Sequence, residues 1–192
     1  RSKYLVGGAV RDQIMGIRTN DFDYVVVGSS PDEMIKLGFK PIGRDFPVFL
    51  HPDSHEEYAL ARTEKKISKG YHGFEFYASP DVTLEEDLKR RDITMNAIAM
   101  DDSGQFIDPF KGIEDIDNKI IRHISDAFAE DPLRVIRVAR FKARFPDFAI
   151  HEKTFQLLKK IVKNKEIQAL SAERVLDEIR KSFSDKNIIM ML

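Results

Sequence analysis

The stretch Gly7-Gly8-Ala9-Val10-Arg11-Asp12, followed by Asp21-Phe22-Asp23, decides the fold. The apolar residues 4–6 before it predict a short strand, and the glycine pair lets the backbone turn sharply and approach a ligand without an intervening Cβ. The helix expected after the turn would aim its free N–H groups and the positive end of its dipole at that ligand. This arrangement favours an anion, such as a triphosphate, at the turn.

Asp21 and Asp23 stand at the head of a second apolar run, residues 24–27. If both lie on one strand, their side chains share a face, with Cα atoms roughly 6–7 Å apart. Two such carboxylates can hold hard divalent cations, and Mg²⁺ prefers oxygen ligands together with substrate phosphates. Each signal alone also fits an ordinary turn or a solvated strand end. Together they predict a two-metal site for nucleotidyl transfer.

The composition is that of an ordinary globular chain of one or two domains. It has 192 residues, of which 42% are hydrophobic and 33% are charged. The absence of cysteine excludes disulfides and cysteine zinc sites and agrees with a cytoplasmic location. The five histidines show no metal-ligand spacing, and no apolar stretch is long enough to span a bilayer. The chain lacks an initiator Met, which indicates a trimmed or altered N-terminus, and it stops in the apolar run 188–192, from which we expect more chain to follow in the natural protein.

Strand and helix patterns divide the chain into two parts. Strands are predicted at residues 4–6, 24–27, 46–50, 57–61 and 74–78. A helix is predicted to begin at Pro31 behind a serine cap. Helical patterns dominate from residue 84, with little strand signal after residue 126. We therefore predict an α/β (α+β) fold, with a small mixed-sheet domain over residues 1–122 and an all-helical domain over residues 123–192.

Basic residues are concentrated, although the formal net charge is only −1. They cluster at residues 65–69 and 89–91, and residues 134–144 contain five basic side chains and no acidic one. On a helix, the four arginines of this last segment fall within an arc of roughly 120°. A core helix with a solvated basic face would show the same pattern. An arginine-only stripe is, however, well suited to phosphates and base edges.

The segment Arg90-Arg91-Asp92-Ile93-Thr94-Met95-Asn96-Ala97 combines two cations, an acid and an amide. These groups could bind a triphosphate and a ribose hydroxyl together. The alternative is an ordinary capped helix start with an acid in its first turn.

Further motifs follow in order: Asp102-Ser103-Gly104 with Asp108-Pro109, then Glu130-Asp131-Pro132-Leu133-Arg134, and more weakly Glu173-Arg174-Val175 with Glu178. With these, the sequence resembles the bacterial tRNA nucleotidyltransferases that build the 3′-terminal CCA, in the class that also contains poly(A) polymerases. The resemblance runs over residues 4–145 and continues more faintly to residue 183. Residues 43–49 and 57–64 look more like the CCA-adding branch.

The resemblance implies a nucleotidyltransferase head domain followed by a helical neck and body domain. Asp21 and Asp23 would hold two catalytic Mg²⁺ ions, and Gly8 and Arg11 would contact the incoming triphosphate. Glu57 would be either a third active-site carboxylate or an exposed acid at a strand end. Three residues of the arginine-aspartate segment would lie near the ribose and phosphates: Arg91, Asp92 and Asn96.

The resemblance also implies that Asp131 and Arg134 read the base, with Arg137 and Arg140 lining the nucleotide pocket. The chemistry of the bases supports this independently. Cytosine and adenine both present an exocyclic amine donor beside a ring-nitrogen acceptor, which matches a carboxylate that accepts and a guanidinium that donates. Uracil and guanine present the reverse order and would leave groups unpaired, at about 1–3 kcal/mol each.

The implied reaction is attack by the 3′-hydroxyl of tRNA on the α-phosphate of CTP, twice, and then of ATP, with release of pyrophosphate. One metal ion would activate the hydroxyl and the other would neutralise the leaving group. The nearest alternatives are a poly(A) polymerase or an enzyme that adds only CC or only A. Their specificity depends on flexible loops, for which residues 65–73 are a candidate. A non-catalytic RNA-binding module and a small-molecule nucleotidyltransferase are more distant. The oligomeric state, the general base and any further tRNA-binding or phosphohydrolase segment stay open.

Overall fold

The computed structural model describes residues 1–42, 48–66 and 74–183. Its main element is a seven-stranded sheet in the order β3-β4-β5-β2-β1-β8-β9. The strands are β1 (Ser2–Val6), β2 (Asp23–Val27), β3 (Lys40–Pro41), β4 (Val48–Leu50), β5 (Glu57–Leu60), β8 (Ala99–Met100) and β9 (Phe106–Ile107). The sheet is mixed, because β2 and β5 run parallel while the other neighbouring pairs are antiparallel.

The register of the three central strands brings the first motifs together. Val6, the last residue of β1, pairs with Asp23, the first residue of β2, so that the glycine turn follows directly beside that carboxylate. On the other side of β2, Asp23 pairs with Glu57. Asp21 precedes the strand, so the prediction that both aspartates lie on it is wrong for Asp21. The pairing with β1 ends at the glycine turn, which leaves Asp21 without a strand partner.

Short helices connect the strands: α1 (Gly8–Ile14), α2 (Pro31–Lys36), α3 (Leu84–Lys89) and α4 (Gly112–Asp117). The predicted start at Pro31 is confirmed, since Ser30 caps α2 in a reciprocal capping box with Glu33. α4 packs close to the 3-10 turn η2 (Thr94–Asn96). The first residue of α4 is Gly112, and only glycine fits there. A Cβ on Gly112 would collide with the carbonyl oxygen of Thr94.

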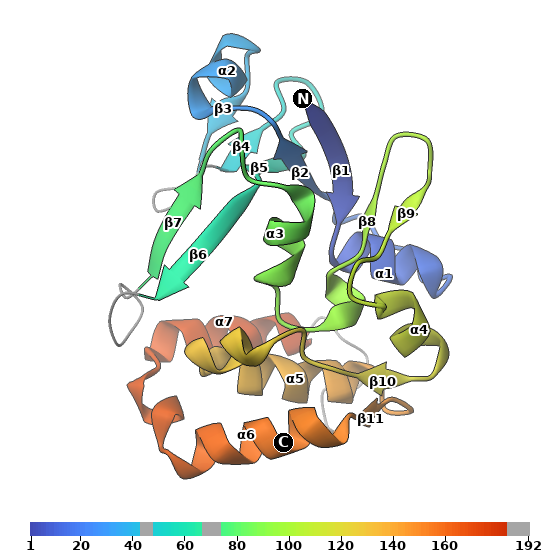
Figure 1. Ribbon diagram of the computed structural model, residues 1–192, viewed down its shortest axis with the longest axis vertical. Coiled ribbons are helices and arrows are strands. Elements are labelled where there is room, and N and C mark those ends of the chain that lie inside the picture. Colours follow the sequence, from blue (N-terminus) through green and yellow to red (C-terminus); the bar gives the residue numbers. More distant parts are fainter. Residues whose placement is uncertain (43–47, 67–73, 184–192) are drawn as a thin grey trace.

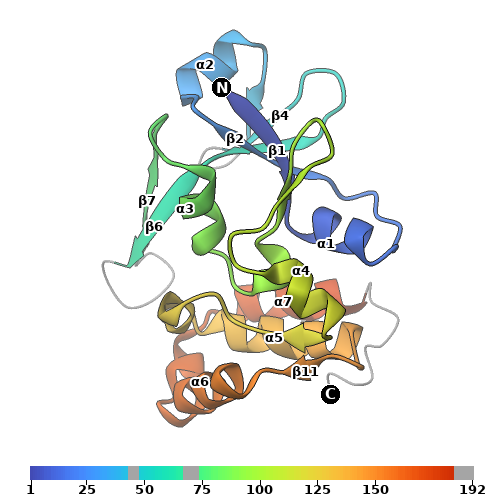
Figure 2. The same ribbon diagram turned by 45° about the vertical axis from the view of Figure 1, so that its right-hand side comes forward.

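Three longer helices form the second part of the chain: α5 (Leu133–Arg144), α6 (Glu152–Lys163) and α7 (Ala172–Phe183). The 3-10 turns η3 (Asp126–Glu130) and η4 (Glu166–Ala169) precede α5 and α7. Figures 1 and 2 show these helices gathered at the end of the molecule away from α2 and the N-terminus. α5 packs against α7, and these two helices carry much of the site described below.

The largest hydrophobic cluster joins the two parts. It contains Val10 of α1 and Met95 of η2 together with Phe141 of α5 and Ile161 of α6. A two-stranded parallel sheet of β10 (Ile120–Ile121) and β11 (Ala149–Ile150) also crosses from one part to the other. The division into domains at residue 122 stays a prediction.

The predicted α/β (α+β) fold class is confirmed, with several strands added. Predicted strands at residues 4–6, 24–27 and 57–61 correspond to β1, β2 and β5, and residues 74–78 form β7 (Phe74–Ala78), which pairs with β6 (Arg62–Lys66). Of the predicted strand at residues 46–50, the last three form β4. The prediction missed β3, β6 and β8–β11, and β11 corrects the prediction of an all-helical second part. Most of these strands have two residues, too few to show an alternating pattern.

Three predictions fall partly or wholly outside the described residues: most of the segment at residues 43–49, most of the loop at residues 65–73, and the apolar run 188–192. Within the described ranges, none of the helices has both the length and the apolar character that crossing a bilayer requires.

Candidate active site

A cavity of about 630 Å³ lies where the glycine turn, the first aspartates and the helices α5 and α7 meet. Nine of its lining residues are arginine or lysine and four are aspartate, in a chain whose formal net charge is −1. It therefore attracts polyanions. All ten site residues predicted from the sequence line this one cavity: Gly8, Arg11, Asp21, Asp23, Arg91, Asp92, Asp131, Arg134, Arg137 and Arg140. Their individual roles stay predictions.

Gly7 shapes one wall of the cavity. Its φ of 72° is in the region that favours glycine, and a Cβ there would lie 3.1 Å from Nη1 of Arg91. The other terminal nitrogen of Arg91 donates to Asp87 at 3.1 Å, and Arg90 donates to the same carboxylate. Burial alone would raise the pKa of Asp87, but Arg90 and Arg91 outweigh it and lower that pKa. Asp87 thus anchors the arginine beside the turn.

The carboxylates of Asp21, Asp23 and Glu57, near the N-terminal end of β2, repel one another. Burial raises the pKa of Asp23 above its ordinary value, and the nearby Asp21 and Glu57 raise it further, while Arg91 opposes them. A bound cation would relieve this repulsion, and the oxygen donors fit a hard divalent ion such as Mg²⁺. In the part of the chain that the structure describes, no group of three or more acidic, histidine or cysteine side chains is assembled as a metal site. Asp21 and Asp23 are thus a fitting but incomplete set of ligands.

Arg11, in the cavity wall, is held by several hydrogen bonds. It is 3% exposed, donates from Nε to Asp12 at 2.8 Å and donates from Nη1 to Asn96 at 2.7 Å. Arg144 donates to the second oxygen of Asp12 at 2.8 Å. Because Arg144 ends α5 and Asp12 belongs to α1, the carboxylate ties these two helices together. Arg11 is therefore a fixed cation whose position depends on both parts of the chain.

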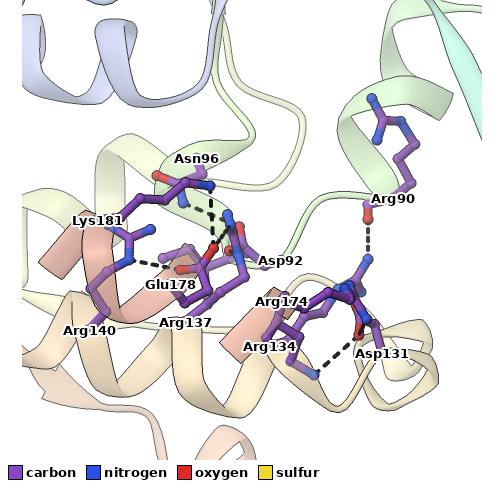
Figure 3. Close-up of polar contacts among 12 residues, drawn as sticks. Arg90, Asp92, Asn96, Asp131, Arg134, Arg137, Arg140, Arg174, Glu178 and Lys181 are labelled. Atoms are coloured by element: carbon purple, nitrogen blue, oxygen red, sulfur yellow. Dashed lines mark hydrogen bonds and ion pairs between the residues drawn. The ribbon is translucent and has the colours of Figure 1, made fainter. Parts of the chain in front are cut away.

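A chain of ion pairs links Asp92, shortly before η2, to α5 and α7 (Figure 3). Arg137 donates to Asp92 at 2.8 Å and to Glu178 at 3.0 Å, and Arg140 donates to Glu178 at 2.9 Å. Burial would raise the pKa of Asp92, but the charge of Arg137 and hydrogen bonds from Arg137, Asn96 and the backbone lower it to about 2. In the same way, Arg137 and Arg140 lower the pKa of Glu178 against the effect of burial. The two arginines are thus held by buried acids.

Asp131 and Arg134 lie at the N-terminal end of α5 (Figure 3). Arg134 donates to the backbone carbonyl of Arg90 at 2.6 Å, which joins α5 to the end of α3. Asp131 accepts two hydrogen bonds from Arg174 of α7, at 3.2 and 2.8 Å. A carboxylate and a guanidinium therefore stand side by side on the cavity wall, each fixed by a partner distant in sequence.

The chain matches the models of two described protein families. Residues 3–122 match the family described as "Poly A polymerase head domain". The chain belongs to this family. Residues 147–190 match a second one, described as "Probable RNA and SrmB- binding site of polymerase A".

Relatives of this head-domain protein carry related names. It is 59% identical over 183 residues to a CCA-adding enzyme of Coxiella burnetii, which covers 95% of this chain and 49% of that protein. Among solved structures, the Bacillus stearothermophilus CCA-adding enzyme in complex with CTP matches with a TM-score of 0.79 and 33% identity, over 99% of this chain and 46% of that one. The Thermotoga maritima CCA-adding enzyme complexed with tRNA matches with a TM-score of 0.76 and 30% identity, over 99% and 45%. The chain thus spans about half the length of the relatives it matches.

The structure contradicts two of the alternative interpretations made from the sequence. The arginine stripe of α5 is not a solvated face, since Arg140 is 8% exposed and both Arg137 and Arg140 are paired with buried acids. The segment at residues 90–97 is not a capped helix start either: residues 94–96 form a 3-10 turn without a side-chain cap.

Sequence reasoning missed several side chains that support the site. Asp12, Asp87 and Lys181 received no role, although each contacts or lines the cavity wall. Arg174 and Glu178 appeared only as a weak motif. Arg174, Glu178 and Lys181 stand at i, i+4 and i+7, the spacing of a single helix face, and this charged stripe was the signal that could have found them.

Proposed function

We propose that this chain is the nucleotide-binding and catalytic part of a CCA-adding tRNA nucleotidyltransferase, which adds C, C and A to the 3′ end of tRNA from CTP and ATP. The observation that carries the proposal is that Asp131 and Arg134 line the same cavity as Asp21 and Asp23. A base reader and a pair of candidate metal ligands thus share one cavity rich in arginine. The relatives named as CCA-adding enzymes support it.

In this proposal the base is selected by hydrogen-bond pattern without a nucleic-acid template. The carboxylate of Asp131 accepts from the exocyclic amine of cytosine or adenine, and the guanidinium of Arg134 donates to the adjacent ring nitrogen. A uracil or guanine carbonyl facing Asp131 would leave two acceptors opposed. Such a mismatch leaves polar groups unpaired and weakens binding of the wrong nucleotide by about 1–3 kcal/mol for each group.

The remaining charged residues bind and orient the triphosphate and ribose. Gly8 lets the phosphates approach the backbone, and Arg91 and Arg11 supply fixed cations near the turn. Asp92 serves the ribose side of the site and also holds Arg137. Asp21 and Asp23 would hold two Mg²⁺ ions, which supply charge neutralisation at the reacting phosphate when bound.

The proposal extends to the organisation of the protein. Residues 1–122 would be the catalytic head domain, and residues 123–192 a helical domain that completes the nucleotide site through α5 and α7. The partner is the 3′ end of tRNA, and the place of action is the cytoplasm.

The first test is binding of the four ribonucleoside triphosphates to this chain by calorimetry in the presence of Mg²⁺. We expect CTP and ATP to bind at least about tenfold more tightly than UTP and GTP, because one charged hydrogen bond contributes about 1.5 kcal/mol. Asp131→Ala should abolish this preference, while Asp177→Asn, at an exposed position on α7, should keep it. Equal affinity for all four nucleotides would contradict the proposal.

The second test is extension of a tRNA that lacks its CCA end, with the nucleotides supplied singly and then as CTP with ATP. Addition of two C and one A, lost in Asp21→Ala and Asp23→Ala, is expected. Long A tails from ATP alone would instead identify a poly(A) polymerase, and addition of only CC or only A would identify one of the specialised enzymes.

A further inference from the structure

Helix α7 presents a row of charged side chains toward the cavity. Arg174 and Lys181 line it, and Glu178, between them on the same helix face, is 2% exposed. Glu178 neutralises two arginines of α5, as described above. Arg174 differs from it because its partner is Asp131, the residue to which the proposed function gives the task of reading the base.

The contact between Arg174 and Asp131 is a bidentate ion pair. Nη1 of Arg174 lies 3.2 Å from Oδ1 and Nη2 lies 2.8 Å from Oδ2, and the side chains are 23% and 17% exposed. The planar fork of a guanidinium matches both oxygens of a carboxylate at once, which fixes the plane of the carboxylate as well as its position. Without such a partner, rotation about the terminal bond of an aspartate is broad.

The count of acceptor positions shows what this leaves for a ligand. An ionised carboxylate has about four lone-pair positions on its two oxygens. Oδ1 accepts from Arg174 and from the backbone N–H of Leu133 at 3.1 Å, and Oδ2 accepts from Arg174 alone among the described residues. One position, on Oδ2, is therefore left, and the residue lines the cavity. The pair need not break when a base enters.

We propose that Arg174 is a positioning residue that sets nucleotide selectivity: it holds the Asp131 carboxylate so that the remaining acceptor position of Oδ2 meets the exocyclic amine of cytosine or adenine. This inference rests on the proposed function. Arg174 itself touches no base. It prevents the Asp131 carboxylate from rotating into orientations in which water or another donor would replace the amine.

The alternative is that the ion pair only fastens α7 to the start of α5. If the ion pair only held α7 against α5, its loss would weaken the binding of every nucleotide by the same factor, because the cavity wall formed by these helices would shift. Loss of an orienting partner would weaken CTP more than UTP, because only CTP presents an amine to Asp131. The ratio of the two affinities therefore separates the two roles.

The experiment measures the dissociation constants of CTP and UTP with Mg²⁺ for the full chain and three variants. Arg174→Gln removes the charge and the fork, and Arg174→Lys keeps the charge but lacks the fork. Arg180→Gln is the matched control, since Arg180 lies on the same helix, is paired with Asp177 and has a side chain that is 75% exposed. Thermal unfolding of each variant is followed in parallel.

We expect the preference for CTP over UTP to fall about tenfold in Arg174→Gln, the equivalent of one charge-assisted hydrogen bond. Arg174→Lys should fall with it, because a point charge cannot hold both oxygens. Arg180→Gln should keep the preference of the unaltered chain.

An unchanged ratio in both Arg174 variants, with CTP and UTP weakened alike, would overturn the inference and leave the fastening role. If Arg174→Gln does not fold, Arg174→Lys alone decides between these outcomes. Absence of any CTP preference in the unaltered chain would instead overturn the proposed function, and the inference with it.

Discussion

Replacing Asp92 by asparagine tests how the ion pairs of the site contribute to stability. Asp92 is 5% exposed and accepts from Nε of Arg137 at 2.8 Å, from the backbone of Ile93 at 2.9 Å and from Asn96 at 3.2 Å. Asparagine is close in shape, and its one acceptor oxygen can keep the contacts that Oδ1 makes with Ile93 and Asn96. Its amide N–H₂ group would stand where Oδ2 accepts from Arg137, so the substitution removes both the negative charge and that hydrogen bond.

The size of the effect follows from the pKa of Asp92, which is lowered from its ordinary value of 3.8 to about 2. A difference of nearly two units corresponds to about 2 kcal/mol in the free energy of unfolding. Because the folded-state pKa is the lower one, this contribution is complete above about pH 4 and is lost as the pH falls through about 2. Asp92→Asn should therefore be less stable by at least about 2 kcal/mol at pH 6, and the difference should narrow as the pH falls toward 2.

The assay is urea unfolding at a series of pH values between 2 and 6. Helix content is followed by far-ultraviolet circular dichroism, because the chain contains no tryptophan. Asp177→Asn, which removes an exposed carboxylate of an ion pair on the surface of α7, is the control and should change the unfolding free energy by well under 1 kcal/mol. If the gap between Asp92→Asn and the unaltered chain stays constant from pH 6 to pH 2, the assignment of the stabilising charge to Asp92 is refuted.

Three other substitutions test the backbone and the buried charges. Gly7→Ala places a Cβ at a φ of 72° and 3.1 Å from Arg91, so we expect a loss of about 1–3 kcal/mol in unfolding free energy together with weaker CTP binding; unchanged stability in urea would contradict the strain. Gly112→Ala should cost at least about 1–3 kcal/mol, because the new Cβ meets the backbone carbonyl of Thr94; an unaltered midpoint of thermal unfolding would show that the turn yields freely. Glu178→Gln leaves two arginines of α5 without their shared charge, and calorimetry should show a loss of about 3–5 kcal/mol; a loss below 1 kcal/mol would mean that solvent replaces the acid.

The parts of the fold that could be predicted from the sequence are those encoded by neighbouring residues. The capped start of α2 depends on Ser30 and Glu33, three residues apart, and the sharp turn depends on the glycine pair that begins at Gly7. The apolar run of β1 and the arginine stripe of α5 are likewise patterns within a single element. All ten predicted site residues line one cavity.

The pairings that complete the site were decided by tertiary structure. Arg174 meets Asp131 across 43 residues of chain, and Arg137 meets Asp92 across 45. Sequence patterns identify charges on a helix face but not which acid of another element will neutralise them. The two-residue strands β10 and β11 could not be predicted for the same reason, because each forms only when its distant partner strand lies beside it.

The sequence by itself therefore determined which residues line the candidate site: the turn, the two aspartates, and the arginines of α5. Only the tertiary structure decided that Asp12 ties α1 to α5, and that Arg174 rather than water is the partner of Asp131. The physical reason is that caps, turns and periodicity are local interactions, whereas the orientation of a buried charge depends on whichever partner the packed core brings within hydrogen-bond distance.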